Sequence, residues 1–226
     1  MKHQSDILAL KYRPKDFSDL IGQEYLVDTI QKSIQLNKIP NAYIFTGIRG
    51  VGKTTTARIV AKMLNCTAFD NSNKPDLLNC EQAKAITEDR HPDVIEIDAA
   101  SNTSVENARE IIENVKYNPV LGKYKVYIID EVHMLSKSAF NALLKTLEEP
   151  PPHSKFIFAT TEISKVPITI LSRCQRFDLR RIDKKVLSLF LETIANKENI
   201  LIEKEALNLI VKSSDGSVRD ALSILD

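Results

Sequence analysis

Cysteine and net charge are both scarce in this sequence. Its 226 residues hold three cysteines, an odd number that does not indicate a disulfide framework and that fits a reducing, cytoplasmic compartment. The 31 basic and 30 acidic side chains give a net charge of +1, so the overall charge does not indicate nucleic-acid binding. Only a local basic patch is left as a source of such binding.

Long apolar runs are missing too. No run approaches the roughly 18 residues that span a bilayer, and the first residues lack the apolar segment of a signal peptide. With 43% hydrophobic and 27% charged residues, the chain is expected to fold around a packed core. These features exclude a secreted disulfide scaffold and a membrane protein, and we expect no membrane partner.

Short runs rich in β-branched and aromatic residues predict a covered parallel sheet. They are "AYIFTG" (42–47), "DVIEIDA" (93–99), "KVYIIDE" (125–131) and "KFIFATT" (155–161). Each is followed by polar or glycine residues, and helix-period segments at 54–65, 104–117 and 137–149 lie between them. "RFDL" further on is strand-like, and residues 21–39 predict an N-terminal helix. The fold class is therefore α/β.

The pattern changes after residue 180. Amphipathic helices then follow one another without strands, as in a small helical domain. We expect one domain over residues 1–180 and a second, all-helical one over 181–226. The last helix runs to Asp226 without a closing glycine or proline, so we expect the helical domain to be incomplete.

A complete phosphate-binding pattern follows the first strand. Gly47, four residues, then Gly52, Lys53 and Thr54 form a P-loop between a strand and a helix. Glycines let backbone N–H groups surround an anion at the helix N-terminus, and the lysine places a charge on the β- and γ-phosphates of a nucleoside triphosphate. The Thr54 hydroxyl is the expected Mg²⁺ ligand. A simple glycine turn does not explain Lys-Thr at this offset.

Two acids end the apolar strand at 125–131. Asp130 is delivered to the carboxyl edge of the sheet, where a second Mg²⁺ ligand is needed, and Glu131 can then polarise the attacking water. Two acids after a strand are more often solvated. Beside a P-loop they predict a nucleoside triphosphatase instead of a passive binder.

Several blocks together resemble one family. They are "ALKYRPKDFSDLIGQE", "IFTGIRGVGKTTTARIVAKMLNC", "DAASNTSVENAREI", "DEVHMLSKSAFNALLKTLEEPP", "ILSRCQRFDL" and "DGSVRDALSILD". Over nearly its whole length the chain resembles the bacterial DNA polymerase III gamma/tau subunits, the AAA+ ATPases of the sliding-clamp loader. Holliday-junction helicases and replication initiators share the P-loop and acidic strand but lack "SRC" with "LLKTLEEPP".

The resemblance implies roles that spacing alone does not assign. Thr161 matches the sensor 1 residue near the γ-phosphate, and Arg219 matches the sensor 2 arginine of the lid. Arg173 matches an arginine finger supplied in trans to the ATP of a neighbouring subunit, which leaves Cys174 as packing. Nearby Arg176, Arg180 and Arg181 fit ordinary surface arginines better.

Other positions match the segments that enclose the nucleotide. Gly50 and Thr55 belong to the P-loop block. Tyr12, Arg13 and Pro14, with Ile21 and Gly22, match a segment that packs around adenine, although an ordered N-terminal arm over the core explains them equally well. The implied cofactors are ATP and Mg²⁺. The implied partners are other clamp-loader subunits in a hetero-oligomer, a pentamer in the family, with the sliding clamp and primed DNA.

The chain departs from the family at its zinc module. Cys66 and Cys80 remain, whereas Leu77 and Ala83 occupy the other two positions of the second cysteine cluster. Two thiolates do not close a tetrahedral site, so we expect no zinc and expect packing, with Leu77 and Leu78 inward, to hold an irregular segment over 66–91. His3, His91, His133 and His153 form no cluster, and each is interpreted as structural or exposed.

Contacts with DNA and the catalytic status leave alternatives. Ser101, Thr103 and Ser104 precede a helix, where hydroxyls favour an N-cap over a phosphate contact. A non-catalytic assembly subunit is disfavoured because Lys53, Thr54, Asp130 and Glu131 are all present. Although the holoenzyme is a DNA-directed DNA polymerase, the chain has no second pair of carboxylates for nucleotidyl transfer.

Overall fold

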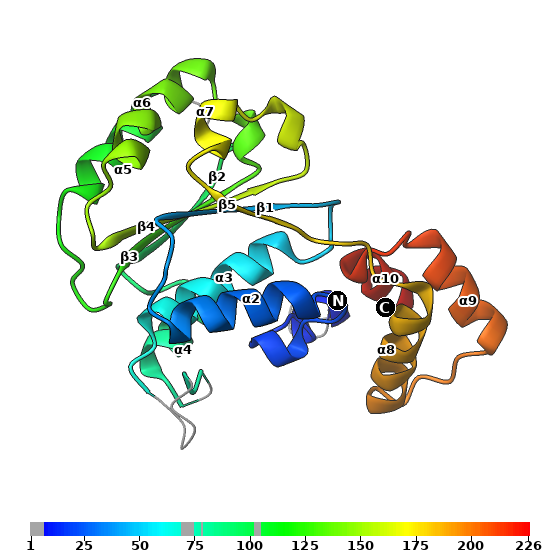
Figure 1. Cartoon of the computed structure of the whole chain (residues 1–226). Helices are drawn as coiled ribbons and strands as arrows, with labels where there is room; N and C mark the ends of the chain where they lie inside the picture. Colours follow the sequence, from blue (N-terminus) through cyan, green and yellow to red (C-terminus); the bar gives the residue numbers. More distant parts are fainter. Residues whose placement is uncertain (1–6, 69–74, 78, 102–104) are drawn as a thin grey trace.

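The centre of the protein is a five-stranded parallel sheet (Figure 1). The computed structural model describes residues 7–68, 75–77, 79–101 and 105–226. The strands are β1 (Ala42–Thr46), β2 (Val94–Asp98), β3 (Lys125–Asp130), β4 (Ser154–Thr160) and β5 (Gln175–Asp178), in the order β2-β3-β4-β1-β5. This confirms the predicted α/β class with a parallel sheet, to which the strand-like "RFDL" region contributes the edge strand β5.

Alternation along the strands divides the core into two layers. In β1, Tyr43 and Phe45 face one apolar cluster, while Ala42 and Ile44 face the other. Both faces are covered, so every residue of β1 and β4 is buried, as expected for parallel strands with helices on both sides. The parallel registers place all strand C-termini at one edge of the sheet.

Helices cover the sheet from both sides (Figure 1). The first layer contains α2 (Glu24–Gln35), α3 (Lys53–Asn65) and α4 (Glu81–Thr87), and the opposite layer contains α5 (Val105–Val115), α6 (Lys137–Glu148) and α7 (Ile168–Leu171). Short 3-10 turns η2 (Phe17–Asp19), η3 (Val132–Met134) and η4 (Ile163–Lys165) connect these elements. The prediction that 66–91 is irregular was wrong for α4, where Ala83 and Ile86, one turn apart, are both buried and Ala83 joins the core cluster that contains α3.

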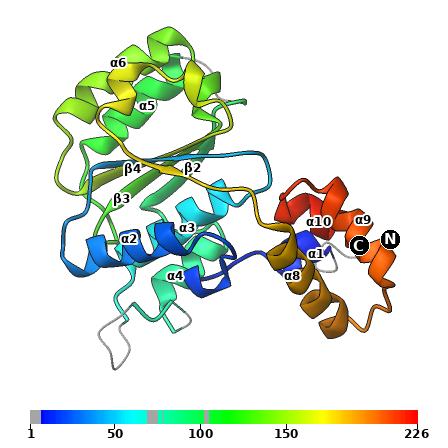
Figure 2. The same ribbon diagram turned by 45° about the vertical axis from the view of Figure 1, so that its right-hand side comes forward.

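A third core holds the C-terminal helices together. α8 (Lys184–Lys197), α9 (Lys204–Ser213) and α10 (Val218–Leu225) pack around Leu187, Leu191 and Leu207, beside the sheet domain (Figure 2). The short helix α1 (Leu8–Lys11), near the other end of the chain, inserts Leu8 into this cluster. The helical part therefore encloses a piece of the N-terminal segment, which links it to the sheet domain from both directions.

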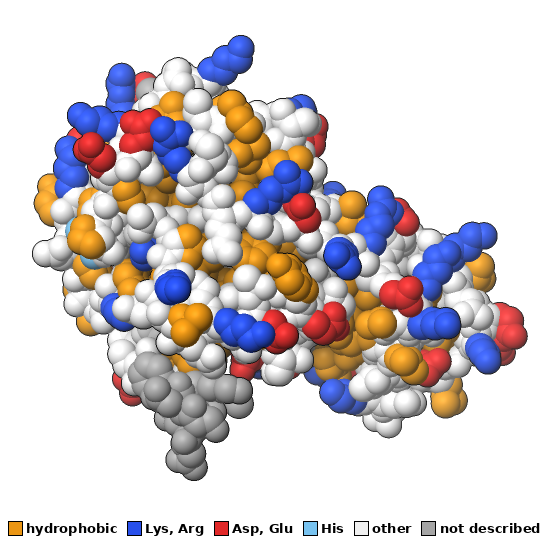
Figure 3. Space-filling model, in the orientation of Figure 1, with side chains coloured by type: hydrophobic (Ala, Val, Ile, Leu, Met, Phe, Trp, Pro, Cys, Tyr) orange, Lys and Arg blue, Asp and Glu red, His pale blue; other side chains and the backbone are white. Residues whose placement is uncertain are grey.

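Surface charges agree with the near-neutral sequence. On the face in Figure 3, basic and acidic side chains are interspersed over the helical part. Across the described ranges, no helix is long and apolar enough to cross a membrane.

Candidate active site

A cavity of about 430 Å³ lies where the sheet domain, the helical part and the N-terminal segment meet. Its walls come from the ends of β3 and α3, the loop before α3, residues 7–21, α8 and α10. Of the residues predicted for nucleotide binding or catalysis, it is lined by Tyr12, Arg13, Pro14, Ile21, Gly50, Gly52, Lys53, Thr54, Thr55, Asp130, Glu131 and Arg219. Residues far apart in sequence are thus collected around one opening.

The glycine loop gives the cavity its floor. Gly50 and Gly52 have φ values of +75° and +103°, which L side chains rarely adopt, and Gly52 directly precedes α3. The Lys53 ammonium lies back over the loop and donates to the carbonyls of Gly47 and Ile48, at 3.1 and 3.0 Å. Burial lowers the pKa of this ammonium, while the carboxylates of Glu131 and Asp130 oppose the effect.

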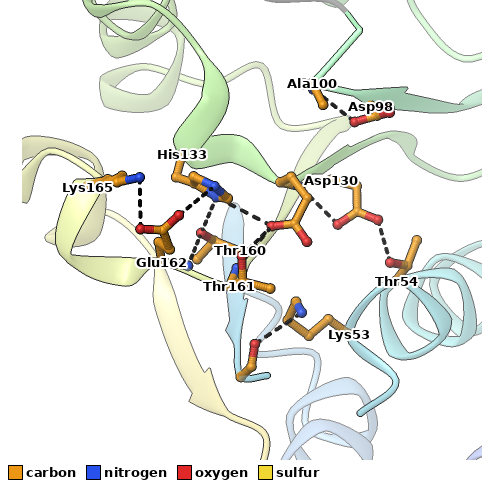
Figure 4. A network of polar contacts seen from close by, with 12 residues as sticks. Lys53, Thr54, Asp98, Ala100, Asp130, His133, Thr160, Thr161, Glu162 and Lys165 are labelled. Carbon is orange, nitrogen blue, oxygen red and sulfur yellow. Dashed lines mark hydrogen bonds and ion pairs between the residues drawn. The ribbon is translucent and has the colours of Figure 1, made fainter. Parts of the chain in front are cut away.

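Hard oxygen atoms meet beside the loop. The Thr54 hydroxyl donates to Asp130 Oδ2 at 2.5 Å, across the gap between α3 and the end of β3 (Figure 4). The other oxygen, Oδ1, accepts the backbone N–H of Glu131 at 2.9 Å. A hydroxyl and a carboxylate in contact are the donor types that suit a divalent cation such as Mg²⁺.

Glu131 is held at the end of β3 by the neighbouring strand. Its backbone is left-handed, with φ 45°, so the chain turns sharply into η3. Glu131 Oε2 accepts both the backbone N–H and the hydroxyl of Thr161, at 3.1 and 3.0 Å. The structure therefore brings the predicted Thr161 to the predicted acid, although Thr161 itself does not line the cavity.

The N-terminal segment and α10 close the cavity from the other side. Arg13 Nε donates to the Thr55 hydroxyl at 3.2 Å, and the backbone N–H of Arg219 donates to the Gly50 carbonyl at 3.3 Å. Burial lowers the pKa of Arg13, with a further contribution from the nearby Arg58 charge. The Tyr12 hydroxyl donates to Glu198 at the end of α8. Arg13 and Arg219 thus line a cavity that Arg49 and Lys53 also line.

With this geometry in place, sequence comparison decides the family. The family described as "DNA polymerase III, delta subunit" matches residues 22–183, and "DNA polymerase III clamp loader subunit, ATPase lid domain" matches residues 187–226. The chain belongs to the DNA polymerase III clamp-loader family. This confirms the resemblance that the sequence blocks indicated.

Individual relatives of the clamp-loader family agree. DNA polymerase III subunit tau/gamma of Haemophilus influenzae is 50% identical over 97% of this chain, and subunit tau of Escherichia coli is 49% identical over 97%. Subunit gamma of Buchnera aphidicola subsp. Baizongia pistaciae is 47% identical over 97%. The chain spans 32%, 34% and 59% of the length of these three relatives, respectively.

A solved structure supports the fold. The Thermotoga maritima RuvB Holliday junction branch migration motor matches with a TM-score of 0.67 at 20% identity, covering 93% of this chain and 63% of that chain. At this identity the likeness concerns fold alone. Together with the ATPase lid domain matched at residues 187–226, it confirms a parallel α/β sheet domain followed by a helical lid.

Arg173 lies away from the cavity, after α7. It pairs with Glu148 at the end of α6 at 2.5 Å and donates to the Thr169 carbonyl at 2.6 Å. Its neighbour Cys174 packs against the core beside α5 and α6, and burial raises the pKa of this thiol to about 12. Arg173, not the cysteine, is therefore the polar group that this turn presents.

Cys66 and Cys80, the two cysteines that remain at the family's zinc-module positions, are both buried. Leu77 is buried in the same cluster, as expected, whereas Leu78 lies outside the described residues. Within the described ranges, no three His, Cys, Asp or Glu side chains gather in a way that could hold a metal. The absence of zinc stays a prediction.

The hydroxyls predicted to cap α5 are only partly covered by the structure. The Ser101 hydroxyl donates to the Asp98 carbonyl at 3.1 Å, and α5 begins at Val105. The N-cap interpretation of Ser101 stays a prediction. Thr103 and Ser104 lie outside the described residues.

Sequence reasoning missed the residues behind Glu131. His133, interpreted as an isolated histidine, lies 3.4 Å from Glu131 Oε2 and 3.0 Å from the Thr160 hydroxyl. The only available signal was its place two residues after the acid, which does not reveal the direction of the side chain. It became visible only once β3 and β4 were placed side by side.

Proposed function

We propose that this chain is the ATP-binding and ATP-hydrolysing motor part of a DNA polymerase III clamp loader, which opens the sliding clamp and loads it onto primed DNA. The observation that carries the proposal is the contact of Thr54 with Asp130 next to the buried Lys53, at the floor of the cavity. Family membership supports the same activity. The chain supplies no polymerase chemistry of its own in this proposal.

The glycine loop and Lys53 bind the phosphates of ATP. The ammonium now donates to two loop carbonyls, so it already lies over the loop where the β- and γ-phosphates bind. Thr54 and Asp130 hold Mg²⁺, which when bound neutralises phosphate charge. Glu131 orients the attacking water, while Thr161 senses the γ-phosphate through its contact with that carboxylate.

The walls of the cavity recognise the remainder of the nucleotide. Tyr12, Arg13 and Pro14 enclose adenine and ribose, and Arg219 reaches the phosphates from α10. Because Arg219 lies on the helical part, ATP binding favours the closed arrangement of the lid through one charge-assisted contact. The lid and the sheet domain, divided near residue 180, thus respond together to ATP.

Arg173 acts on a neighbouring subunit. Its distance from its own cavity supports supply in trans, in a pentameric hetero-oligomer. A planar cation that completes the site only on assembly stabilises the transition state by a factor of roughly 10³ or more. We therefore expect this chain alone to be largely monomeric, to bind ATP and to hydrolyse it slowly. We place it in the cytoplasm.

The test is ATP hydrolysis in a complex reconstituted with the other clamp-loader subunits, with and without clamp and primed DNA. We expect stimulation by both, loss of ATP binding in Lys53→Ala, and intact binding without stimulated turnover in Arg173→Ala. Arg176→Ala is the matched control, because Arg176 pairs with Asp178 on β5 at 2.7 Å and has no proposed role. No stimulation by clamp and DNA would remove the assignment and favour another AAA+ motor, such as a Holliday-junction helicase.

Zinc is tested separately. We propose that the chain folds without it, since Cys66 and Cys80 are both buried and cannot supply four ligands. Elemental analysis of the purified protein should find no zinc, and a stoichiometric amount would refute this.

A further inference from the structure

His133 lies directly behind the acid at the end of β3. It belongs to η3, which begins after the left-handed turn at Glu131, and its side chain is only 6% exposed. Each ring nitrogen faces a carboxylate: Nδ1 lies 3.4 Å from Glu131 Oε2, and Nε2 lies 3.4 Å from Glu162 Oε1 (Figure 4). The ring therefore bridges an acid of the cavity and an acid outside it.

On the inner side, His133 shares its target with Thr161. Both contact Oε2 of Glu131, so all polar contacts of this carboxylate with the described part of the chain fall on a single oxygen. The two hydrogen bonds from Thr161 and the approach of Nδ1 to the same oxygen restrict rotation of the carboxylate and leave Oε1 to accept from the attacking water. Without the ring, the backbone N–H and the hydroxyl of Thr161 remain as the polar tethers.

On the outer side, the ring is set by the end of β4. Thr160 Oγ1 lies 3.0 Å from Nδ1 and accepts the backbone N–H of Glu162 at 3.0 Å. Glu162 also pairs with Lys165 of η4 at 2.8 Å, and that hydrogen bond lowers the pKa of the Glu162 carboxyl. Glu162 and Lys165 are 46% and 58% exposed, so the chain of contacts runs from the protein surface to Glu131.

We propose that His133 is a positioning residue for hydrolysis: its Nδ1 fixes the Glu131 carboxylate, and the Nε2 contact with Glu162 holds the ring in place. This rests on the proposed ATPase function. Because η4 precedes α7 and Arg173 in the chain, the outer end lies on the segment that also carries the proposed trans arginine. A buried histidine that merely fills space makes a different prediction, since only its volume then matters.

Two amide substitutions distinguish a histidine that positions Glu131 from one that only fills space. The side-chain nitrogen of Asn can occupy the place of Nδ1, whereas that of Gln can occupy the place of Nε2. We therefore compare His133→Asn, His133→Gln and His133→Ala in the reconstituted complex, measuring kcat, KM and binding of a fluorescent ATP analogue. His133→Asn should stay within about threefold of the unaltered protein, while Gln and Ala should lose on the order of 10- to 100-fold in kcat with little change in KM.

Glu162→Gln tests the outer contact. It keeps the shape of the side chain, removes the charge that faces Nε2, and should lower kcat less than His133→Gln does. Lys155→Gln is the control. Lys155 contacts Asn41 at the opposite end of β4 from Glu162, so this substitution should leave kcat unchanged. Equal activity of the Asn and Gln variants, or KM values that change in step with kcat, would overturn the proposal.

A second measurement does not depend on turnover. In nucleotide-free protein, the imidazole NMR signals of His133, assigned with His133→Asn, should shift in both Glu131→Gln and Glu162→Gln. If the His133 signals do not shift in Glu131→Gln, the contact between His133 and Glu131 is refuted, regardless of the kinetic results. If the unaltered complex does not hydrolyse ATP while these shifts are present, the proposed function fails and the geometry at His133 stands.

Discussion

Gly50 connects the glycine loop to the lid, and replacing it with alanine should loosen α10. A Cβ at this position would lie 2.1 Å from Ser217 Oγ and 3.2 Å from Arg219 Cβ. Ser217 is the N-cap of α10, where its hydroxyl accepts the backbone N–H of Asp220 at 3.2 Å. To make room for the methyl group, the Ser217 hydroxyl has to leave its capping position or the first turn of α10 has to move away from the loop.

The size of the effect follows from two contributions. Alanine at φ +75° costs about 1–2 kcal/mol in backbone strain, and disturbing a serine N-cap costs about 0.5–2 kcal/mol. Gly52→Ala shares the first contribution only, because at φ +103° its added Cβ meets nothing closer than a Leu20 methyl group at 3.9 Å. The difference between the two variants, about 1 kcal/mol, therefore measures the contact between loop and lid.

Amide hydrogen exchange of nucleotide-free protein reads this out locally. In Gly50→Ala, amides of α10 (218–225) should exchange about five- to tenfold faster than in Gly52→Ala, as expected for a local opening that is easier by about 1 kcal/mol. Amides of α6 serve as an internal reference and should not differ. Equal protection of α10 in the two variants would refute the idea that the loop supports the lid through Gly50.

Three further predictions concern stability and reactivity. Burial opposes ionisation of Asp93, but three backbone N–H donors at 2.7 Å outweigh it and hold its pKa low. This stabilisation is present above the unfolded-state pKa of about 3.9 and is lost as pH falls towards the folded pKa. In chemical denaturation, Asp93→Asn should therefore lower the free energy of unfolding by about 3 kcal/mol at pH 7, and by less at low pH. Burial raises the pKa of the Cys66 and Cys174 thiols to about 12, so iodoacetamide at about pH 8 should label them only in denaturant, as mass spectrometry can check. Arg58→Ala breaks the two hydrogen bonds to Glu96, at 2.5 and 2.7 Å, and should lower the free energy of unfolding by about 2 kcal/mol in urea titrations.

Local pattern was sufficient for most of the fold. All four predicted runs became strands, and in β1, β3 and β4 the β-branched and aromatic residues face a core on both sides. The edge strand β2 is only partly buried. α4 escaped prediction because its seven residues carry only two buried positions, too few to show a helical period among the polar residues around them. The insertion of Leu8 into the lid core escaped as well, since it depends on a contact between the two ends of the chain.

The P-loop half of the site could be predicted from local sequence, whereas the contacts between its two halves depend on how the strands are arranged. Lys53 and Thr54 were predictable because a P-loop is a continuous segment whose backbone geometry is local. The meeting of Thr54 with Asp130, and of Glu131 with Thr161, follows from parallel strands that end at one edge, with β3 adjacent to β4. Thr54 and Asp130 were expected at one metal site, whereas Glu131 and Thr161 were given separate roles and their contact was not predicted.

His133 marks the limit of this reasoning. Its direction depends on the left-handed backbone of Glu131, a conformation that the sequence "IIDEVH" does not reveal and that a glutamate adopts only when its surroundings compensate the strain. Here Thr161, just after β4, and His133, in η3, contact the Glu131 carboxylate. If strain at Glu131 is retained to aim its carboxylate, then loosening either support should reduce turnover before it reduces ATP binding, which separates positioning of the acid from formation of the cavity.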